Sequence, residues 1–337
     1  MDENLIIRYF LAFRSFLNLY GSLLNGLLLY LAVFKSPKQI RVYSVIIANF
    51  ALTDFISNIT DLLVQQRHIP AGTSLVYISY GPCTYSGPFT CYFFYALMLH
   101  ALGHSQWSLL FSFGYRYYIL FGNNETRLKI FLKLLLFYVP SLLQLITFLI
   151  AYDNPEDVTQ LLATVFPSYI GNYTITGNLS IFEPFMLYTI VYMVVPPVPM
   201  YLAILFYRSR IIRYLDKNTK MMSKESKVMH RLMLKALTYQ ATLPGFFLIG
   251  IISYVIGQLH IYNGPIQELF TLTPTTFITI LSPLLYMYLV RGYRNQLKKW
   301  FLRLPFVKKS MVDIEPTNSN VGRVSVFVTS RRSTLQF

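Results

Sequence analysis

Charged residues are scarce in this chain. Of its 337 residues, 13% are Asp, Glu, Lys or Arg, while 54% are hydrophobic and the mean hydropathy is +0.46. A soluble globular domain carries about 25% charged residues, because water has to solvate its surface. The low charge therefore excludes a soluble domain, and we expect the chain to expose most of its surface to lipid.

Histidines and acidic residues are also few, at 5 and 14. His100 and His104 stand one helical turn apart, but a catalytic zinc site takes three protein ligands, and the other histidines lie in or beside loops. A membrane hydrolase likewise needs several histidines or acids at one depth. We therefore predict no enzyme, no metal and no cofactor, and we interpret the two histidines as hydrogen bonded between helices near Trp107.

Long apolar runs, in contrast, are abundant. A helix that crosses a bilayer needs about 20 apolar residues, and seven runs bounded by charged or turn residues satisfy this length. They cover residues 9–34, 43–65, 91–120, 128–151, 184–207, 232–257 and 268–290. The sequence predicts an all-α membrane protein, a seven-transmembrane helix bundle within 1–304, followed by a polar and disordered cytoplasmic tail over 305–337.

Basic residues set the predicted orientation, because loops rich in Lys and Arg stay in the cytoplasm. The first, third and fifth connections are basic, with Lys35, Lys38, Arg41, Arg127, Lys129 and the run from Arg208 to Lys235. The opposite connections are nearly free of basic residues, and 152–183 carries only acids. The amino terminus is therefore predicted outside and the carboxyl terminus inside, where 291–309 is again basic.

The net charge of +15 could indicate nucleic acid binding. The basic residues gather, however, at predicted cytoplasmic helix ends, where each interacts with anionic lipid headgroups by about 1 kcal/mol. We therefore expect membrane lipids and no nucleic acid as partners. The same basic rim would also suit an acidic face of a signalling protein, and the sequence leaves both uses open.

The two cysteines, Cys83 and Cys91, fall on the predicted outer side, just before the third span. That side is oxidising and turn residues lie between them, so a disulfide is allowed, and two buried thiols are the alternative. The outer connection 152–183 also contains two N-glycosylation acceptors, Asn172-Tyr-Thr and Asn178-Leu-Ser. Their position fits the orientation, and their use is left open.

Polar residues inside the spans are costly in hydrocarbon unless they face the bundle interior. Asn25 and Asp54 fall at comparable depth in the first two spans and could share one polar cluster. That cluster would be either a packing network or an ion or proton site.

Several short motifs resemble those of the rhodopsin-like superfamily of G-protein-coupled receptors. The residues that carry the resemblance are Asn25, Asp54 in Leu-Thr-Asp, Tyr115-Arg116-Tyr117, Pro244, Ser282-Pro283-Leu-Leu-Tyr286 and the amphipathic stretch from Gly292 to Leu304. The last stretch implies a short amphipathic cytoplasmic helix after the seventh span. The chain also departs from the superfamily. Tyr115 replaces an acid, Thr242 an aromatic residue and Ser282 an asparagine, and no cysteine lies in 152–183 for the usual bridge.

Longer runs resemble the nematode serpentine chemoreceptors of the Srd family. They are Lys35-Ser-Pro, Arg41-Val-Tyr-Ser, Ile69-Pro-Ala-Gly-Thr-Ser-Leu, Tyr77-Ile-Ser, Gly81-Pro-Cys83, Cys91-Tyr, Met98-Leu-His100, His104-Ser and Ser112-Phe-Gly-Tyr-Arg116-Tyr-Tyr. The resemblance implies a G-protein-coupled chemosensory receptor of the plasma membrane, in the ciliated endings of sensory neurons. Its ligand would be an extracellular small molecule, a pheromone-like ligand or a short peptide.

The mechanism we expect is a ligand-driven shift in helix packing that opens a cytoplasmic cleft for a heterotrimeric G protein. The predicted ligand pocket consists of Tyr95, Met98, Leu99, Leu102, Phe246, Ile249 and Thr276. The predicted switch consists of Arg116, Tyr286, Pro244 and Pro283. A seven-span channel and a transporter are the alternatives. A channel would reverse the orientation, and a transporter would show internal repeats, which are not found.

Overall fold

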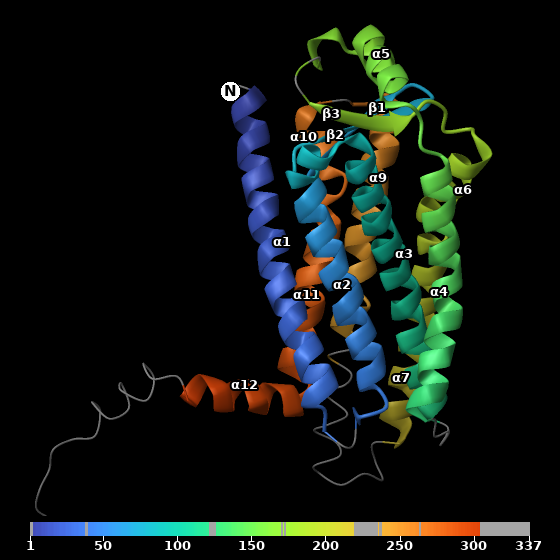
Figure 1. Cartoon of the computed structure of the whole chain (residues 1–337). Helices are drawn as coiled ribbons and strands as arrows, with labels where there is room; N and C mark the ends of the chain where they lie inside the picture. The colour runs from blue at the N-terminus through green and yellow to red at the C-terminus, as the bar shows by residue number, and fades with distance from the viewer. Residues whose placement is uncertain are drawn as a thin grey trace, which may run out of the picture. The chain divides into compact units, whose positions relative to one another are not determined.

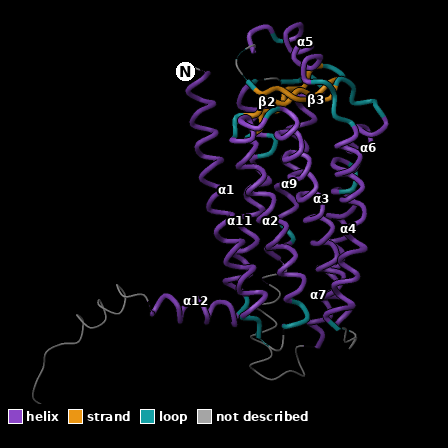
Figure 2. Tube along the Cα trace, in the orientation of Figure 1, coloured by secondary structure: helices purple, strands orange, loops and turns teal. Residues whose placement is uncertain are grey.

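The computed structural model describes residues 3–37, 40–120, 126–169, 171, 173–218, 235, 238–262 and 264–303. Long helices run side by side, and a small sheet lies across one end of them (Figures 1 and 2). We call this the sheet end, and the amino terminus lies there as well (Figure 1). The helices and the sheet belong to one compact unit, Met1–Arg294, while Asn295–Phe337 forms a second.

Most helices of the bundle begin and end within about six residues of the predicted spans. Their bounds are α1 Glu3–Phe34, α2 Ser44–Val64, α3 Pro88–Ile119, α4 Arg127–Ile150, α6 Pro184–Val194, α7 Pro197–Asn218, α9 Leu243–Gln258, α10 Pro265–Phe270 and α11 Thr273–Leu289. The exceptions are α7, which continues to Asn218 beyond the predicted end at 207, and α9, which begins at Leu243, whereas the predicted start at 232 lies outside the described residues. Helix α12, Arg291–Arg303, follows α11 where the sequence predicts an amphipathic helix. The prediction of a helical membrane bundle is confirmed.

Six helical stretches of the described residues are long and apolar enough to cross a membrane. Helix α3 is not among them, although it is 32 residues long, because it carries polar side chains such as His100, His104 and Gln106. It packs against α2, α4 and α7, and these polar residues are buried. A helix surrounded by protein tolerates polar residues that a lipid-facing helix does not.

Three of the stretches are interrupted. A break at 195–196 separates α6 from α7, and a break at 271–272 separates α10 from α11. A third break, at 241–242, comes directly before α9. Pro197 and Pro244 lie in the first turn of the helix that follows each break, where a missing amide hydrogen costs nothing. The sequence places Pro244 within a kinked helix, whereas the chain turns just before it. Pro140 and Pro283 lie inside α4 and α11.

The sheet is a feature that the sequence analysis missed. Strands β1 Gln66–Ala71 and β2 Ser74–Ser79 form a hairpin, and β3 Thr174–Asn178 pairs antiparallel with β2. Gly72 has a φ of +67°, which a two-residue hairpin turn requires and which glycine adopts without strain. Pro70 lies in β1, an edge strand, where a residue without an amide hydrogen is tolerated.

The two faces of the sheet are buried against different partners. Leu75 and Tyr77 pack into the core of the helix bundle, whereas Val76 and Ile78 pack on helix α5, Pro155–Val165. Helix α5 lies on the side of the sheet away from the bundle (Figure 1). Because successive side chains of a strand point to opposite faces, β2 is buried on both sides and reads as a continuous apolar run.

A disulfide joins Cys83 to Cys91, so the first of the two alternatives that the sequence allows is the one observed. Cys83 belongs to the short 3₁₀-helix η2, Pro82–Ser86, and Cys91 to the first turn of α3. Gly81, just before η2, has room for no side chain, since an added Cβ would lie 2.1 Å from the carbonyl oxygen of Leu63. The start of α3 is therefore held close to the end of α2.

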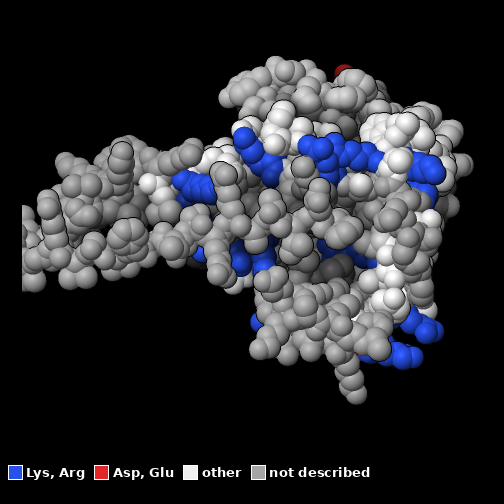
Figure 3. Space-filling view, turned by 90° about the horizontal axis from the view of Figure 1, so that it is seen from below, with Lys and Arg blue, Asp and Glu red and all other residues white. Residues whose placement is uncertain are grey.

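The end opposite the sheet is rich in basic side chains, and we call it the basic end. Figure 3, which views the molecule from this end, shows Lys and Arg side chains around the helix ends. The exposed basic residues there include Lys35, Arg41, Arg127, Lys129, Arg210, Arg213 and Lys217. Much of the predicted basic connection, 219–234, and the predicted disordered tail, 305–337, lie outside the described residues.

Candidate functional site

A cavity of about 110 Å³ lies inside the bundle, directly beneath the sheet. We call it the sheet-end cavity. Residues of β1, β2, α3, α4, α6, α9 and α11 and of the break before α11 line it, and most of these side chains are apolar or aromatic. An apolar cavity of about 150 Å³ is known to take up benzene. The sheet-end cavity therefore has the size and the lining of a site for a small organic molecule.

Helix α3 contributes the residues that the sequence predicts. Tyr95, Leu99 and Leu102 line the cavity, at the spacing of one helix face. Met98 does not line it, but is 2% exposed and belongs to the surrounding core.

The predicted residues of the sixth and seventh spans lie one position away from residues that line the cavity. Phe246 stacks on Phe277, with ring centroids 6.0 Å apart, and Ile249 is 45% exposed on the outer surface of the bundle. Thr276 is buried but does not line the cavity. One residue along a helix turns the side chain by about 100°, which moves it to another face.

The residues found in their place are Phe247, Gly250, Ile251 and Tyr254 on α9, and Thr271, Leu272 and Thr275 beside and within α11. The breaks at 241–242 and 271–272 set the rotation of these helices. The sequence marks the breaks only by Pro244 and Pro274.

His68 and Tyr77 are cavity residues that the sequence analysis missed. They are paired across β1 and β2 and face the bundle. The short apolar run from Leu75 to Ile78, bounded by serines and next to the Gly72 turn, is the signal that could have located this hairpin. His68 is 6% exposed, and its Nε2 forms a hydrogen bond with the Tyr95 hydroxyl at 2.8 Å.

His68 is held in its neutral form. Burial, and secondarily the positive charge of nearby Arg14, lowers the pKa of His68 from 6.5 to about 3. Arg14 is itself buried and paired with Asp61, which also accepts a hydrogen bond from Asn18 at 2.6 Å. Arg14 donates as well to the carbonyl of Gln66 at 2.9 Å, which ties α1 to the start of β1.

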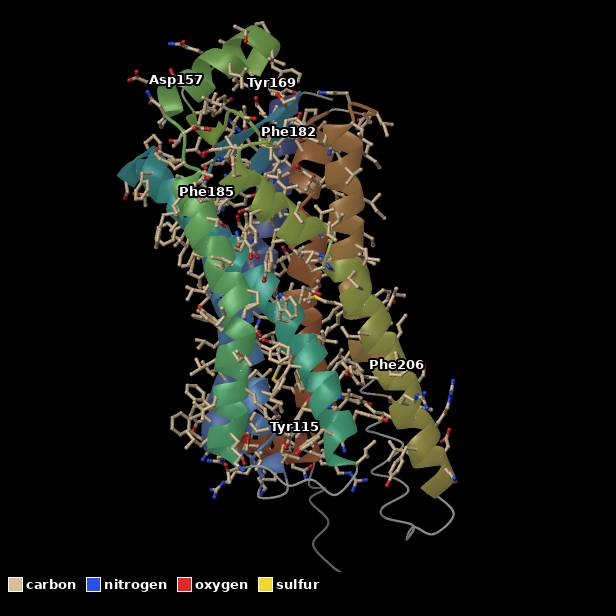
Figure 4. All side chains as sticks on the ribbon, turned by 90° about the vertical axis from the view of Figure 1, so that its right-hand side faces the viewer. Tyr115, Asp157, Tyr169, Phe182, Phe185 and Phe206 are labelled. Carbon is tan, nitrogen blue, oxygen red and sulfur yellow. A yellow bond between two sulfur atoms is a disulfide. The ribbon has the colours of Figure 1, made fainter. Side chains whose placement is uncertain are left out.

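A second buried ion pair joins the sheet to α10. The Arg67 Nε donates to Glu268 Oε2, and the guanidinium lies 4.3 Å from the ring centroid of Tyr169, which Figure 4 labels at the sheet end. Burial opposes the charge on Arg67, but the Glu268 carboxylate outweighs it, so the pKa of Arg67 is raised. The strand that covers the cavity is thus attached to the seventh span.

The predicted switch residue Arg116 is buried near the basic end of α3, at 6% exposure. It donates a hydrogen bond to the hydroxyl of Tyr43, and its guanidinium lies 4.7 Å from the Tyr43 ring centroid. The same hydroxyl lies 2.8 Å from Ser112 Oγ and 3.5 Å from the Tyr286 hydroxyl. The structure therefore brings Arg116 and Tyr286 together through Tyr43, and we call these four residues the Arg116 cluster.

Tyr115, which Figure 4 labels near the basic end, stacks on Tyr43 with ring centroids 6.2 Å apart. An aromatic neighbour thus packs where the superfamily has an acidic one. Arg116 is held by an aromatic hydroxyl within the bundle, and it does not extend to the surface.

Asn25 and Asp54 are both buried, but they share no hydrogen bond. Asn25 donates to the carbonyl of Thr279 on α11 at 2.7 Å, and Asp54 accepts from Ser105 on α3 at 3.1 Å. The two side chains therefore join different pairs of helices.

The two histidines of α3 contact separate neighbours. The Nδ1 of His100 lies 2.7 Å from the Ser141 carbonyl of α4, and the Nε2 of His104 lies 3.3 Å from Asn49 Oδ1 of α2. These contacts fit hydrogen bonds between helices, as interpreted from the sequence. Among the described residues, no group of three or more His, Cys, Asp or Glu side chains could hold a metal.

The glycosylation prediction fails at Asn178. This residue is fully buried in β3, its Oδ1 accepts from the Tyr77 hydroxyl, and its Nδ2 donates to Tyr92 and to the Ala151 carbonyl. A glycan would be attached to the same Nδ2, for which the fold leaves no space. The other predicted acceptor, Asn172, lies outside the described residues.

A bundle of long apolar helices, with an apolar cavity beneath one end, defines a multi-pass membrane protein. The family model described as serpentine type 7TM GPCR chemoreceptor Srd matches residues 10–299. The chain therefore belongs to the Srd family of seven-transmembrane chemoreceptors, as the resemblance implied.

Relatives from Caenorhabditis elegans agree with this assignment. The chain is 38% identical to serpentine receptor class delta-19 over 293 residues, which cover 86% of each chain. It is 38% identical to class delta-18 over 309 residues, or 90% of each chain. It is 36% identical to class delta-2 over 291 residues, which cover 84% of this chain and 80% of the relative.

Proposed function

We propose that this protein is a chemosensory receptor of the plasma membrane, with the sheet end outside the cell and the basic end in the cytoplasm. The exposed Lys and Arg side chains of the basic end support this orientation, since basic loops stay on the cytoplasmic side. The disulfide at the other end agrees, because disulfides persist in oxidising compartments. The ciliated endings of sensory neurons are the proposed location.

The ligand of this receptor is an extracellular small molecule that binds in the sheet-end cavity. The observation that carries the proposal is the position of this cavity, which the sheet covers and which α3 lines with Tyr95, Leu99 and Leu102. Side chains from five helices and two strands line the cavity. Its aromatic and apolar lining suits a ligand whose body is apolar.

The partner at the other end is a heterotrimeric G protein, recruited through the Arg116 cluster. Helix α3 extends from the cavity residue Tyr95 to Arg116, so one rigid element contacts both sites. The breaks at 195–196, 241–242 and 271–272 are places at which the fifth, sixth and seventh spans can bend. A ligand that binds one packing of these helices more tightly would shift the population toward it.

The test is calcium or second-messenger output in cells that express the chain, across a panel of odorants and metabolites. Wild type is compared with Arg116→Ala and with Lys129→Ala at matched surface expression. Lys129 is exposed at the same end, so it controls for the loss of one positive charge. We expect a ligand response in wild type and Lys129→Ala, reduced at least tenfold in Arg116→Ala.

Two outcomes would contradict this proposal. A response that is equal in all three proteins would show that the Arg116 cluster takes no part in signalling. A fast ionic current that persists in Arg116→Ala would favour a ligand-gated channel. Antibody access to a tag on the amino terminus of intact cells checks the orientation, which is wrong if only permeabilised cells are labelled.

A further inference from the structure

The polar atoms of the sheet-end cavity are not equivalent. The threonines of its wall bond to carbonyl groups of their own chain segments: Thr189 to Phe185 at 3.3 Å, Thr271 to Gln267 at 3.1 Å and Thr275 to Leu272 at 2.6 Å. Tyr77 donates to Asn178. These hydroxyl groups already have acceptors within the protein, so they gain little from a hydrogen bond to a bound molecule.

His68 differs from them. Its Nε2 is bound to the Tyr95 hydroxyl, whereas its Nδ1 is buried and has no hydrogen-bond partner among the described residues. A buried nitrogen without a partner is unfavourable, because the atom has lost its water and gained nothing in return. His68 lines the cavity, so a molecule in the cavity lies beside the ring that carries this nitrogen.

The surroundings of His68 determine which ligand charge the cavity accepts. No Asp, Glu, Lys or Arg is found among the described residues that line the cavity. A charged ligand would therefore lose its hydration without meeting an opposite charge. The absence of charged side chains from the described lining selects against both amines and carboxylates.

The distribution of polar groups sets the orientation of the ligand. His68 and Tyr77 come from the sheet, and Tyr95 and Tyr254 are near enough to interact with Tyr77 electrostatically. The cavity thus has a polar end beneath the sheet. Elsewhere its wall consists of side chains such as Leu102, Val194 and Phe247.

We propose that the ligand is a small, uncharged molecule with an apolar body and one hydroxyl or carbonyl group, and that this group binds Nδ1 of His68. The proposal rests on the proposed function, in which the sheet-end cavity is the ligand site. A neutral imidazole has one N–H group and one acceptor nitrogen. The Tyr95 hydroxyl occupies one of the two, so the ligand pairs with the other. A hydroxyl group can do so in either tautomer, and a carbonyl only when Nδ1 carries the hydrogen.

The test is direct binding to the purified full-length protein, measured as thermal stabilisation, so that it does not depend on signalling. The probes share one carbon chain: hexanol, hexanal, hexane, hexanoate and hexylamine. Wild type is compared with His68→Phe, which keeps an aromatic ring but removes both nitrogens, and with His68→Asn, whose amide lies near the Nδ1 position. Leu99→Trp fills the cavity and tests where the probes bind.

We expect wild type to bind hexanol and hexanal at least tenfold more tightly than hexanoate or hexylamine. His68→Phe should lose about tenfold in affinity for hexanol and hexanal, a factor typical of one hydrogen bond. Its affinity for hexane should not change. His68→Asn should recover part of the loss, and Leu99→Trp should bind none of the probes.

Each other outcome has a definite meaning. An equal loss for hexane and hexanol in His68→Phe would show that His68 only shapes the cavity, and would overturn the proposal. Preference for hexanoate or hexylamine, or binding of no probe, would overturn it as well. Unchanged binding in Leu99→Trp would show that the ligand site lies elsewhere, which is a failure of the proposed function and not of the chemistry assigned to His68.

Discussion

The ion pair between Arg67 and Glu268 offers a sharp test of how the sheet is held over the bundle. Both side chains are almost fully buried, at 4% and 1% exposure, and the pair joins β1 to α10. The perturbations are Arg67→Met and Glu268→Leu, singly and together. Each single change leaves one buried charge without its partner, whereas the double change leaves two apolar side chains in contact.

The expected magnitude follows from this burial. Removing one partner of a buried pair costs about 3 to 5 kcal/mol, because the remaining charge is not compensated, while replacing both partners is often close to neutral. The entropy of unfolding grows with chain length, so a loss of 1 kcal/mol lowers the melting temperature of a 337-residue chain by roughly 1 to 2 °C. We therefore expect each single variant to melt about 3 to 10 °C below wild type, and the double variant to recover most of the difference.

The assay is thermal unfolding of the purified protein in one detergent. Glu156→Gln is the matched control, since Glu156 is exposed on α5 and loses a charge of the same kind at the same end. We expect the control to stay within about 0.5 kcal/mol of wild type. If the single variants melt with the control, or if the double variant is no more stable than the singles, then the pair does not hold the sheet and the reasoning is refuted.

Three further predictions concern other features of the sheet end. Burial lowers the pKa of His68 to about 3 in the folded state, against 6.5 in the unfolded state, so its contribution to the free energy of unfolding is fully present above pH 6.5 and is lost as the pH falls. At pH 5 the free energy of unfolding of wild type should be lower by about 2 kcal/mol, a loss that His68→Phe should not show. Melting temperature measured against pH checks this. Replacing Cys83 and Cys91 by serine opens a loop with a sequence separation of 8 and should cost about 2.5 kcal/mol, after which reductant should cause no further loss. Gly81→Ala should destabilise the fold by 3 kcal/mol or more, since a backbone carbonyl blocks the added Cβ, whereas Gly114→Ala, with nothing within 4 Å, should stay near wild type; equal melting of the two would contradict this.

Part of the candidate site could be predicted from the sequence. Tyr95, Leu99 and Leu102 were found because one helix face repeats every three to four residues, and α3 is regular along this stretch. Arg116 and Tyr286 were found from motifs, and they meet in the structure through Tyr43. Each of these cases depends on local periodicity or on a short pattern.

Other residues were missed for physical reasons. Phe246 and Ile249 follow the break at 241–242, and no local pattern specifies which side of α9 faces the cavity. Asn178 matches a glycosylation tripeptide, yet it lies in β3 and is buried. The partner of β3 is β2, which is distant in the sequence, so the tripeptide alone does not reveal this burial. His68 lies in a short hairpin whose function as a cover for the cavity depends on contacts with α3 and α9.

The sequence by itself determined that this protein lies in a membrane, which segments form helices and where the positive charge gathers, because hydrophobicity, helix length and charge are properties of contiguous residues. The tertiary structure alone decided that β2 separates the bundle from α5, that His68 lies over the cavity with one nitrogen unpaired, and that Arg67 reaches Glu268. These features join residues that are distant in the chain. They depend on how helices rotate and where strands pair, which no local pattern specifies.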